Sequence, residues 1–112
     1  PLDICVLCES TIPHGDIMCQ AIPIGGLRLI DKGEADDKII AVLKDDLLYG
    51  KYKDIADLPQ SVVNRLQHYF LTYKNLPGEP MTCEIANVYG REEAHEVIRK
   101  SITDYLNNFG ML

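Results

Sequence analysis

The chain has 112 residues, enough for one compact domain, and 46% of them are hydrophobic, so a core can form. Its net charge of -6 at pH 7 argues against nucleic acid as a partner, because binding to the phosphate backbone needs a basic surface. No apolar run approaches the roughly twenty residues of a membrane-spanning helix and no signal peptide is recognisable, so we expect a cytoplasmic protein with no membrane partner.

The first 43 residues are predicted to form four short strands, at 2–8, 16–24, 27–30 and 38–43, because these runs are rich in aliphatic side chains. The pair Gly25-Gly26 is expected to break or bulge the chain between the second and third strands. Residues 31–37 are expected to form an acidic loop. Short strands separated by turn signals at this spacing favour an antiparallel barrel or sandwich.

The second half of the chain is predicted to contain two helices. Pro59 suits the first turn of a helix, and apolar residues then recur at helical spacing until Pro77-Gly78. A strand over 81–88 and a helix over 91–109 complete the order β-β-β-β-α-β-α, which is an α+β fold in a single domain over residues 1–112. The expected apolar faces consist of Val62, Leu66, Tyr69, Tyr73 and Leu76 in the first helix and Ala94, Ile98, Ile102, Tyr105 and Phe109 in the second.

Four cysteines occur, and Cys5 and Cys8 form a Cys-x-x-Cys pattern. A zinc site would need a second pair or histidines at ligand spacing, and neither follows. A thioredoxin-like motif would open a helix, whereas these two cysteines lie in a strand-like run. We therefore interpret Cys5, Cys8, Cys19 and Cys83 as reduced, partly buried thiols.

The acidic stretch 31–38 carries the strongest chemical signal. Asp31, Glu34, Asp36 and Asp37 place four carboxylates within seven residues, and these repel one another unless solvent or cations screen them. Such hard oxygen ligands suit Mg²⁺, Mn²⁺ or Ca²⁺. Charge alone nevertheless favours a solvated acidic turn, and the pattern of an EF-hand loop is absent.

A second signal lies at the end of the first predicted helix. Tyr73 can be interpreted as a core aromatic residue, but a phenol at the end of an apolar stripe can also reach a polar ligand. Lys74 alone would be a surface lysine. His68 falls outside the stripe and is interpreted as a structural or exposed histidine rather than a ligand or base.

Three segments together resemble family I soluble inorganic pyrophosphatases. Residues 1–7 resemble the end of the family's D-G-D-P-L-D segment. Asp31, Asp36 and Lys38 fit the family's second acidic motif. In that motif four residues separate two aspartates, and one further residue separates the second aspartate from a lysine. Residues 68–74 are similar to the family's H-x-F-x-x-Y-K run. The resemblance extends over essentially all 112 residues.

The resemblance implies a fold and a reaction. The fold would be part of an OB-like five-stranded antiparallel barrel with two packed helices. The reaction would be the Mg²⁺-dependent hydrolysis of inorganic diphosphate to two phosphates by a metal-activated water. Carried over residue by residue, the metal ligands would be Asp3, Asp31 and Asp36, and the groups that contact phosphoryl oxygens would be Lys38, Tyr73 and Lys74. Glu34 and Asp37 match no family role and are expected to be solvated.

The resemblance covers only the C-terminal portion of the pyrophosphatase domain. The family's N-terminal portion would supply the general base, so no residue here is assigned as a certain catalytic group. It would also supply barrel strands, without which the sheet has open edges. We therefore expect residues 1–112 alone to be inactive or nearly so. Bacterial members commonly form hexamers, which predicts a homo-oligomer.

Two other functions remain open at this stage. One is a non-catalytic module of OB-like fold that binds divalent cations or phosphate. The other is an OB fold that binds single-stranded nucleic acid, as many such barrels do. The net charge and the acidic stretch argue against the second alternative.

Overall fold

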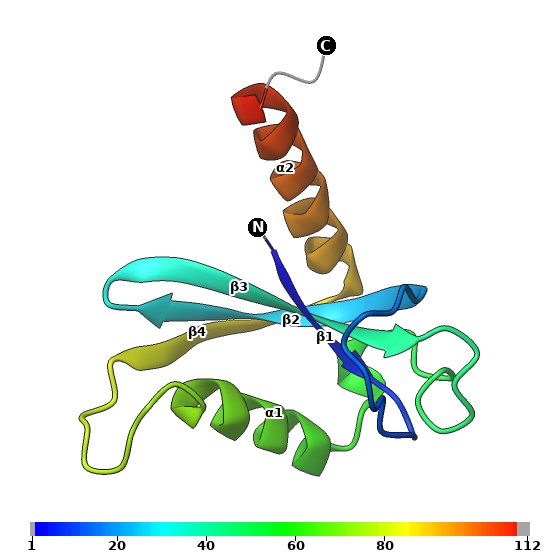
Figure 1. The fold of residues 1–112 in the computed structure, drawn as a ribbon, viewed down its shortest axis with the longest axis horizontal. Helices are drawn as coiled ribbons and strands as arrows, with labels where there is room; N and C mark the ends of the chain where they lie inside the picture. The colour runs from blue at the N-terminus through cyan, green and yellow to red at the C-terminus, as the bar shows by residue number, and fades with distance from the viewer. Residues whose placement is uncertain (1, 110–112) are drawn as a thin grey trace.

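The computed structural model describes residues 2–109, in which four strands form one sheet and two long helices pack against it. The strands pair in the order β1-β3-β2-β4. A short 3₁₀ helix, η1, precedes α1 (Figure 1). The elements in chain order are β1 (Asp3–Leu7), β2 (Ala21–Asp31), β3 (Glu34–Leu43), η1 (Ile55–Asp57), α1 (Gln60–Thr72), β4 (Cys83–Gly90) and α2 (Arg91–Phe109).

The strands β2 and β3 form a hairpin whose turn consists of Lys32 and Gly33. Both residues have positive φ, 52° and 82°, and Asp31 pairs directly with Glu34. Two residues with positive φ make the tight turn whose twist matches that of the flanking strands. The predicted acidic loop over 31–37 is therefore wrong, because Asp36 and Asp37 lie within β3.

The pair Gly25-Gly26 does not break the chain, so the two strands predicted on either side of it are one strand, β2. A register shift between Pro23 and Gly25 absorbs the irregularity. A Cβ atom on Gly26 would lie 2.5 Å from the ring of Tyr89, so glycine is needed there for the close approach of β4. The strand predicted over 16–24 is wrong for residues 16–20, which lie outside regular structure.

The prediction that the chain forms part of an OB-like five-stranded antiparallel barrel is not confirmed by the described residues. The sheet has four strands and is mixed, since β1 runs parallel to β3. Within residues 2–109, β1 and β4 are the edge strands and the sheet does not close. The predicted α+β class is correct. The parallel pairing of β1 with β3 could not be predicted, because it joins segments about 35 residues apart and the hydrophobic pattern within each segment does not specify its distant partner.

The helix α1 covers one face of the sheet and contributes to the main core (Figure 1). Its buried residues are Val63 and Leu66, and Phe70 is partly buried beside them. The predicted apolar face is thus only partly right, because Tyr69 and Tyr73 are 53% and 42% exposed. The sheet supplies Ile24, Leu27, Leu29, Ile40 and Val42 to this core.

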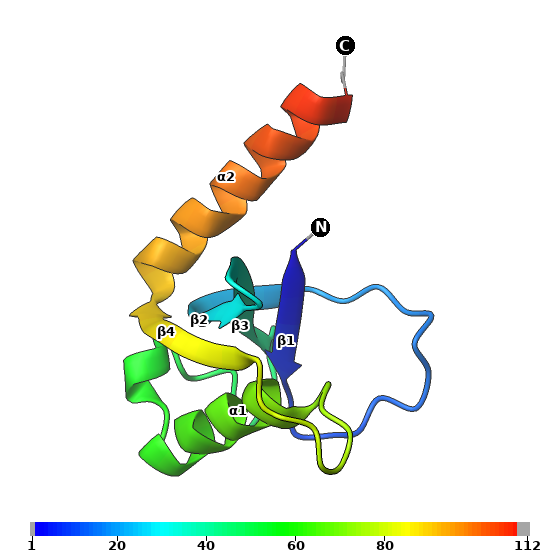
Figure 2. The same ribbon diagram turned by 90° about the vertical axis from the view of Figure 1, so that its left-hand side faces the viewer.

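The helix α2 packs on the opposite face with its first turns alone. Ala94 is fully buried with Ile39 and Tyr89, and Val97 and Ile98 pack against them. Beyond that point the helix leaves the sheet (Figure 2), and the apolar side chains that continue its stripe, Ile102, Tyr105 and Phe109, are more than half exposed. Neither α1 nor α2, the long helices of residues 2–109, has the length and hydropathy to cross a lipid bilayer.

Candidate functional site

A cavity of about 240 Å³ lies between the turn end of the β2–β3 hairpin, the end of α1 and the segment that leads into β4. Five of the predicted site residues line it, namely Asp31, Asp36, Lys38, Tyr73 and Lys74. The sixth, Asp3, lines a second hollow of about 360 Å³, which shares Lys38, Phe70 and Tyr73 with the first. The structure thus brings together residues that are up to 71 positions apart in the sequence.

Strand geometry explains why the aspartates meet Lys38. Side chains alternate along a strand, so Asp36 and Lys38 share the face of β3 that α1 covers. The parallel pairing of β1 with β3 sets Asp3 beside Lys38 in register. Leu29 and Asp31 reach the same face from β2.

The ammonium of Lys38 bridges two carboxylates. Its Nζ lies 2.6 Å from Oδ2 of Asp3 and 3.0 Å from Oδ2 of Asp36, and it donates to both. The side chain of Lys38 is 3% exposed, and Lys38 is the one charged residue in the buried class among residues 2–109. Burial by itself lowers the pKa of Lys38, but the hydrogen bonds and charges of Asp3 and Asp36 outweigh it, so the pKa stands above its ordinary value.

The carboxyl group of Asp3 shows the reciprocal effect. The hydrogen bond from Lys38 lowers its pKa below the ordinary 3.8, and the charge of Lys38 adds to this. The side chain of Asp3 is nevertheless 69% exposed. The carboxyl group of Asp3 is therefore largely in contact with solvent while it holds the buried lysine.

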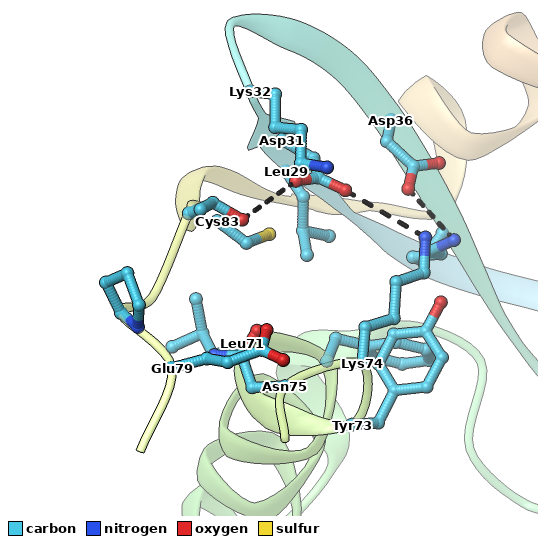
Figure 3. Close-up of a pocket in the computed structure, with 14 residues that line it drawn as sticks. Leu29, Asp31, Lys32, Asp36, Leu71, Tyr73, Lys74, Asn75, Glu79 and Cys83 are labelled. Carbon is cyan, nitrogen blue, oxygen red and sulfur yellow. Dashed lines mark hydrogen bonds and ion pairs between the residues drawn. The ribbon is translucent and has the colours of Figure 1, made fainter. Parts of the chain in front are cut away.

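A looser pair lies across the cavity. Nζ of Lys74 is 3.9 Å from Oδ2 of Asp31, and the hydroxyl of Thr82 donates to Oδ1 of Asp31 at 3.4 Å. Lys74 is 57% exposed, so its ammonium remains hydrated. Figure 3 shows Asp31 and Asp36 reaching down from the sheet toward Lys74 and Tyr73, which come from the end of α1.

The position of Tyr73 is fixed by aromatic packing. Its ring stacks on Tyr69 with centroids 5.2 Å apart and meets the edge of Phe70 at 5.8 Å. The ammonium of Lys74 lies 5.5 Å from the ring centroid. These contacts hold the phenol at the cavity (Figure 3).

Sequence reasoning missed several residues that line the cavity. Cys83 pairs with Asp31 across β2 and β4, and burial, together with the charges of Asp31 and Asp36, raises the pKa of its thiol. Glu79 and Asn75 also line the wall, from the segment that follows α1 (Figure 3). The run Pro77-Gly78 marked this segment only as a helix end, so no local pattern pointed to it.

The structure has Cys5, Cys8, Cys19 and Cys83 as free thiols.

Asp37 was expected to be solvated, and this expectation is wrong. Its Oδ1 accepts from Nε of Arg28 and from the hydroxyl of Tyr89, both at 3.0 Å, and Arg28 also pairs with Glu93 at 3.0 Å. This cluster lies on the α2 face of the sheet, opposite the cavity. Asp36 and Asp37 are therefore neighbours in sequence whose side chains lie on opposite faces of the sheet.

The donor set of the cavity suits a hard cation. Within residues 2–109 no three side chains of His, Cys, Asp or Glu form a ready metal cluster. Mg²⁺, however, is usually bound by one or two carboxylates, with water and substrate phosphate completing the shell. Asp3 and Asp36 form such a pair, since their Oδ2 atoms lie within 3.0 Å of one common point, the Nζ of Lys38.

Comparison with known proteins places the chain in a family. The family model described as inorganic pyrophosphatase matches residues 1–106. The inorganic pyrophosphatase of Chlamydia caviae is 57% identical over 97% of this chain and 53% of its own length. The crystal structures of the enzymes from Neisseria gonorrhoeae and Thermus thermophilus give TM-scores of 0.80 and 0.82 at 35% and 30% identity, over 93% and 94% of this chain and 60% of theirs. The chain spans about half the length of the curated relatives it matches, and it belongs to the inorganic pyrophosphatase family.

Proposed function

We propose that this chain forms part of the active site of an enzyme that hydrolyses inorganic diphosphate to two phosphates. The observation that carries the proposal is the convergence of acidic and basic side chains at one cavity, around the buried ammonium of Lys38. Membership of the family supports the reaction. The groups proposed for it are Asp3, Asp31 and Asp36 as metal ligands and Lys38, Tyr73 and Lys74 as contacts to phosphoryl oxygens.

Family I pyrophosphatases are metal-dependent hydrolases, and we propose Mg²⁺ as the metal here. When bound, Mg²⁺ would lower the pKa of a coordinated water and offset the charge of diphosphate. Asp3 and Asp36 would hold it, and Asp31 would lie on the substrate side of the cavity. Carboxylates alone would repel a diphosphate anion, so the cation is required by the charge of the site itself.

The basic and phenolic groups suit the other half of the reaction. Lys74 offers a hydrated, exposed ammonium at the cavity mouth, and Tyr73 offers a phenol that stacking holds in one orientation. Such donors stabilise the charge on phosphoryl oxygens through position and electrostatics, which are the main contributions to phosphoryl transfer. In the balanced reaction water attacks one phosphorus, the bridging P–O bond breaks, and two phosphates leave.

Hydrolysis can be tested in a chimera in which residues 1–112 replace the corresponding part of the Chlamydia caviae relative, which is 57% identical to them. Phosphate release would be measured with Mg²⁺ and diphosphate. We expect turnover comparable to that of the relative. Asp36→Asn should lower it by about 100-fold or more, because a ligand that acts on the transition state is lost. Glu34→Gln, an exposed carboxylate beside the hairpin turn, is the matched control and should leave turnover unchanged.

An inactive but folded chimera would contradict the proposal. A non-catalytic module that binds cations or phosphate would instead bind Mg²⁺ and phosphate in the same chimera without releasing product. A homo-oligomeric assembly, hexameric in bacteria, and a cytoplasmic location are both expected from the family and stay predictions.

A further inference from the structure

The buried ammonium of Lys38 lies at the point that the carboxylates of Asp3 and Asp36 would offer to a metal ion. We propose that Lys38 is an internal counter-ion, which a divalent cation displaces from this carboxylate pair and which then serves the phosphate anion. Metal binding would thereby promote phosphate binding through the movement of one side chain. The inference rests on the proposed function, because it takes Asp3 and Asp36 as the ligands of the cation.

The two cations cannot share the carboxylate pair. Nζ of Lys38 is 2.6 Å from Oδ2 of Asp3 and 3.0 Å from Oδ2 of Asp36, so the ammonium occupies the point at which these two oxygens converge. Mg²⁺ requires oxygen ligands at about 2.0–2.1 Å. A cation bound to these oxygens would meet the charge of the ammonium at close range with little intervening water, because Lys38 is 3% exposed. Entry of the metal therefore requires the ammonium to leave.

The surroundings provide a place for the displaced group. Lys38 lines both hollows of the site, of about 240 and about 360 Å³. Its backbone is fixed by pairing with Asp3 in β1 and Leu27 in β2, so only the flexible four-carbon side chain has to turn. In the cavity of about 240 Å³, the displaced ammonium would approach Lys74 and Tyr73.

Charge then couples the two ligands. An ammonium released toward Lys74 adds a second positive charge to the phosphate side of the cavity, which is unfavourable until an anion arrives. Diphosphate or phosphate would remove that cost. By linkage, phosphate must then increase the affinity for Mg²⁺ by the same factor by which Mg²⁺ increases the affinity for phosphate.

Lys74 provides a matched comparison for Lys38. Both lysines line the same cavity and both lie near aspartates. Lys74 is 57% exposed and 3.9 Å from Asp31, whereas Lys38 is buried and in direct contact with its partners. If positive charge merely weakened Mg²⁺ binding in general, removal of either ammonium should tighten that binding. If Mg²⁺ displaces an ammonium, only removal of the Lys38 ammonium should do so.

The first test detects the displacement in the unmodified 112-residue chain. An amine-reactive reagent would be applied with and without Mg²⁺, and labelling of each lysine would be read by peptide mass spectrometry. We expect labelling of Lys38 to rise about tenfold at saturating Mg²⁺, equivalent to the loss of ~1.4 kcal/mol of protection. Labelling of Lys74 should stay high throughout, and NaCl at equal ionic strength should not release Lys38. Continued protection of Lys38 at high Mg²⁺ would overturn the inference.

The second test measures the competition by calorimetric titration with Mg²⁺. Lys38→Met should bind Mg²⁺ about tenfold more tightly than the wild type, because no ammonium has to be displaced. Lys74→Met should differ from the wild type much less. Added inorganic phosphate should tighten Mg²⁺ binding to the wild type and have little effect on Lys38→Met. Equal tightening by the two substitutions, or none by Lys38→Met, would overturn the inference.

The outcomes separate this inference from the proposed function. Hydrolysis by the chimera together with a Lys38 that stays protected in Mg²⁺ refutes displacement and leaves the enzyme assignment intact. Release of Lys38 by Mg²⁺ together with a folded chimera that does not hydrolyse diphosphate supports displacement and refutes the enzyme assignment. Circular dichroism of Lys38→Met checks its fold, which should persist because Asp3 is 69% and Asp36 is 33% exposed and both can be solvated.

Discussion

At the scale of single residues, the site depends on how a buried charge is kept neutralised. An ammonium as enclosed as that of Lys38 is tolerated only when it is paired and hydrogen-bonded. Its partners Asp3 and Asp36 are both more exposed than the lysine, so solvent can reach the carboxylates from outside. The same contact therefore stabilises the fold and holds two carboxylates ready for a ligand.

The ion pair gives a pH dependence that can be measured. The pKa of Asp3 in the folded protein is below its ordinary 3.8, chiefly because of the hydrogen bond from Lys38, so the folded state prefers the ionised form. The resulting stabilisation is present above the pKa of the unfolded chain and disappears as the pH falls through the folded pKa. We expect Asp3→Asn to unfold at lower urea than the wild type at neutral pH, and the difference to shrink as the pH falls below the ordinary pKa of 3.8.

Urea denaturation of both proteins across this range checks the prediction. Glu34→Gln serves as the control, because Glu34 is an exposed carboxylate at the start of β3. A difference between wild type and Asp3→Asn that stays constant from neutral to acidic pH would show that the ion pair with Lys38 does not stabilise the fold.

At the scale of elements, local patterns predicted α1 and α2 well but not the hairpin. The helix α1 follows from periodic apolar residues between Pro59 and Pro77-Gly78, and α2 follows from the apolar stripe that begins after Gly90. The four carboxylates of residues 31–37 favour a solvated loop, and this charge signal hides the strand that continues through Asp36 and Asp37. Gly33, which has φ of 82°, was the signal for a two-residue turn. The pairing of β1 with β3 depends on contacts between distant segments and has no local signal.

The packing between β2 and β4 can be tested through Gly26. A Cβ atom there would lie 2.5 Å from the ring of Tyr89, which is 4% exposed and cannot swing into solvent. We expect Gly26→Ala to lower the free energy of unfolding by about 1–3 kcal/mol, the usual cost of overpacking a core. Gly15→Ala is the matched control, since no atom lies within 4 Å of its Cβ position. Equal stability of the two variants would refute the packing described for β2 and β4.

The neighbouring aspartates of β3 should separate stability from binding. Asp37 accepts hydrogen bonds from Arg28 and Tyr89 on the α2 face, whereas Asp36 faces the cavity. We expect Asp37→Ala to lower the free energy of unfolding by about 1–2 kcal/mol through the loss of these bonds, with little effect on Mg²⁺ binding. Asp36→Ala should weaken Mg²⁺ binding strongly. Calorimetry and urea denaturation of both variants check this, and weakened binding in Asp37→Ala alone would reverse the assignment.

At the scale of the whole molecule, the fold carries an assembled set of site residues on an open sheet. The edges of β1 and β4 and the outer half of α2 are uncovered among residues 2–109 (Figure 2). The curated relatives are about twice as long as the region that this chain matches. If the proposed function is correct, these 112 residues must nevertheless hold the metal and phosphate contacts in place.

That requirement is tested most directly by calorimetric titration of the 112-residue chain with imidodiphosphate, a diphosphate analogue that resists hydrolysis. We expect binding that depends on Mg²⁺, at one site per chain, and that is lost in Asp36→Asn. Absence of binding by a folded chain, or binding equally strong without Mg²⁺, would contradict that requirement.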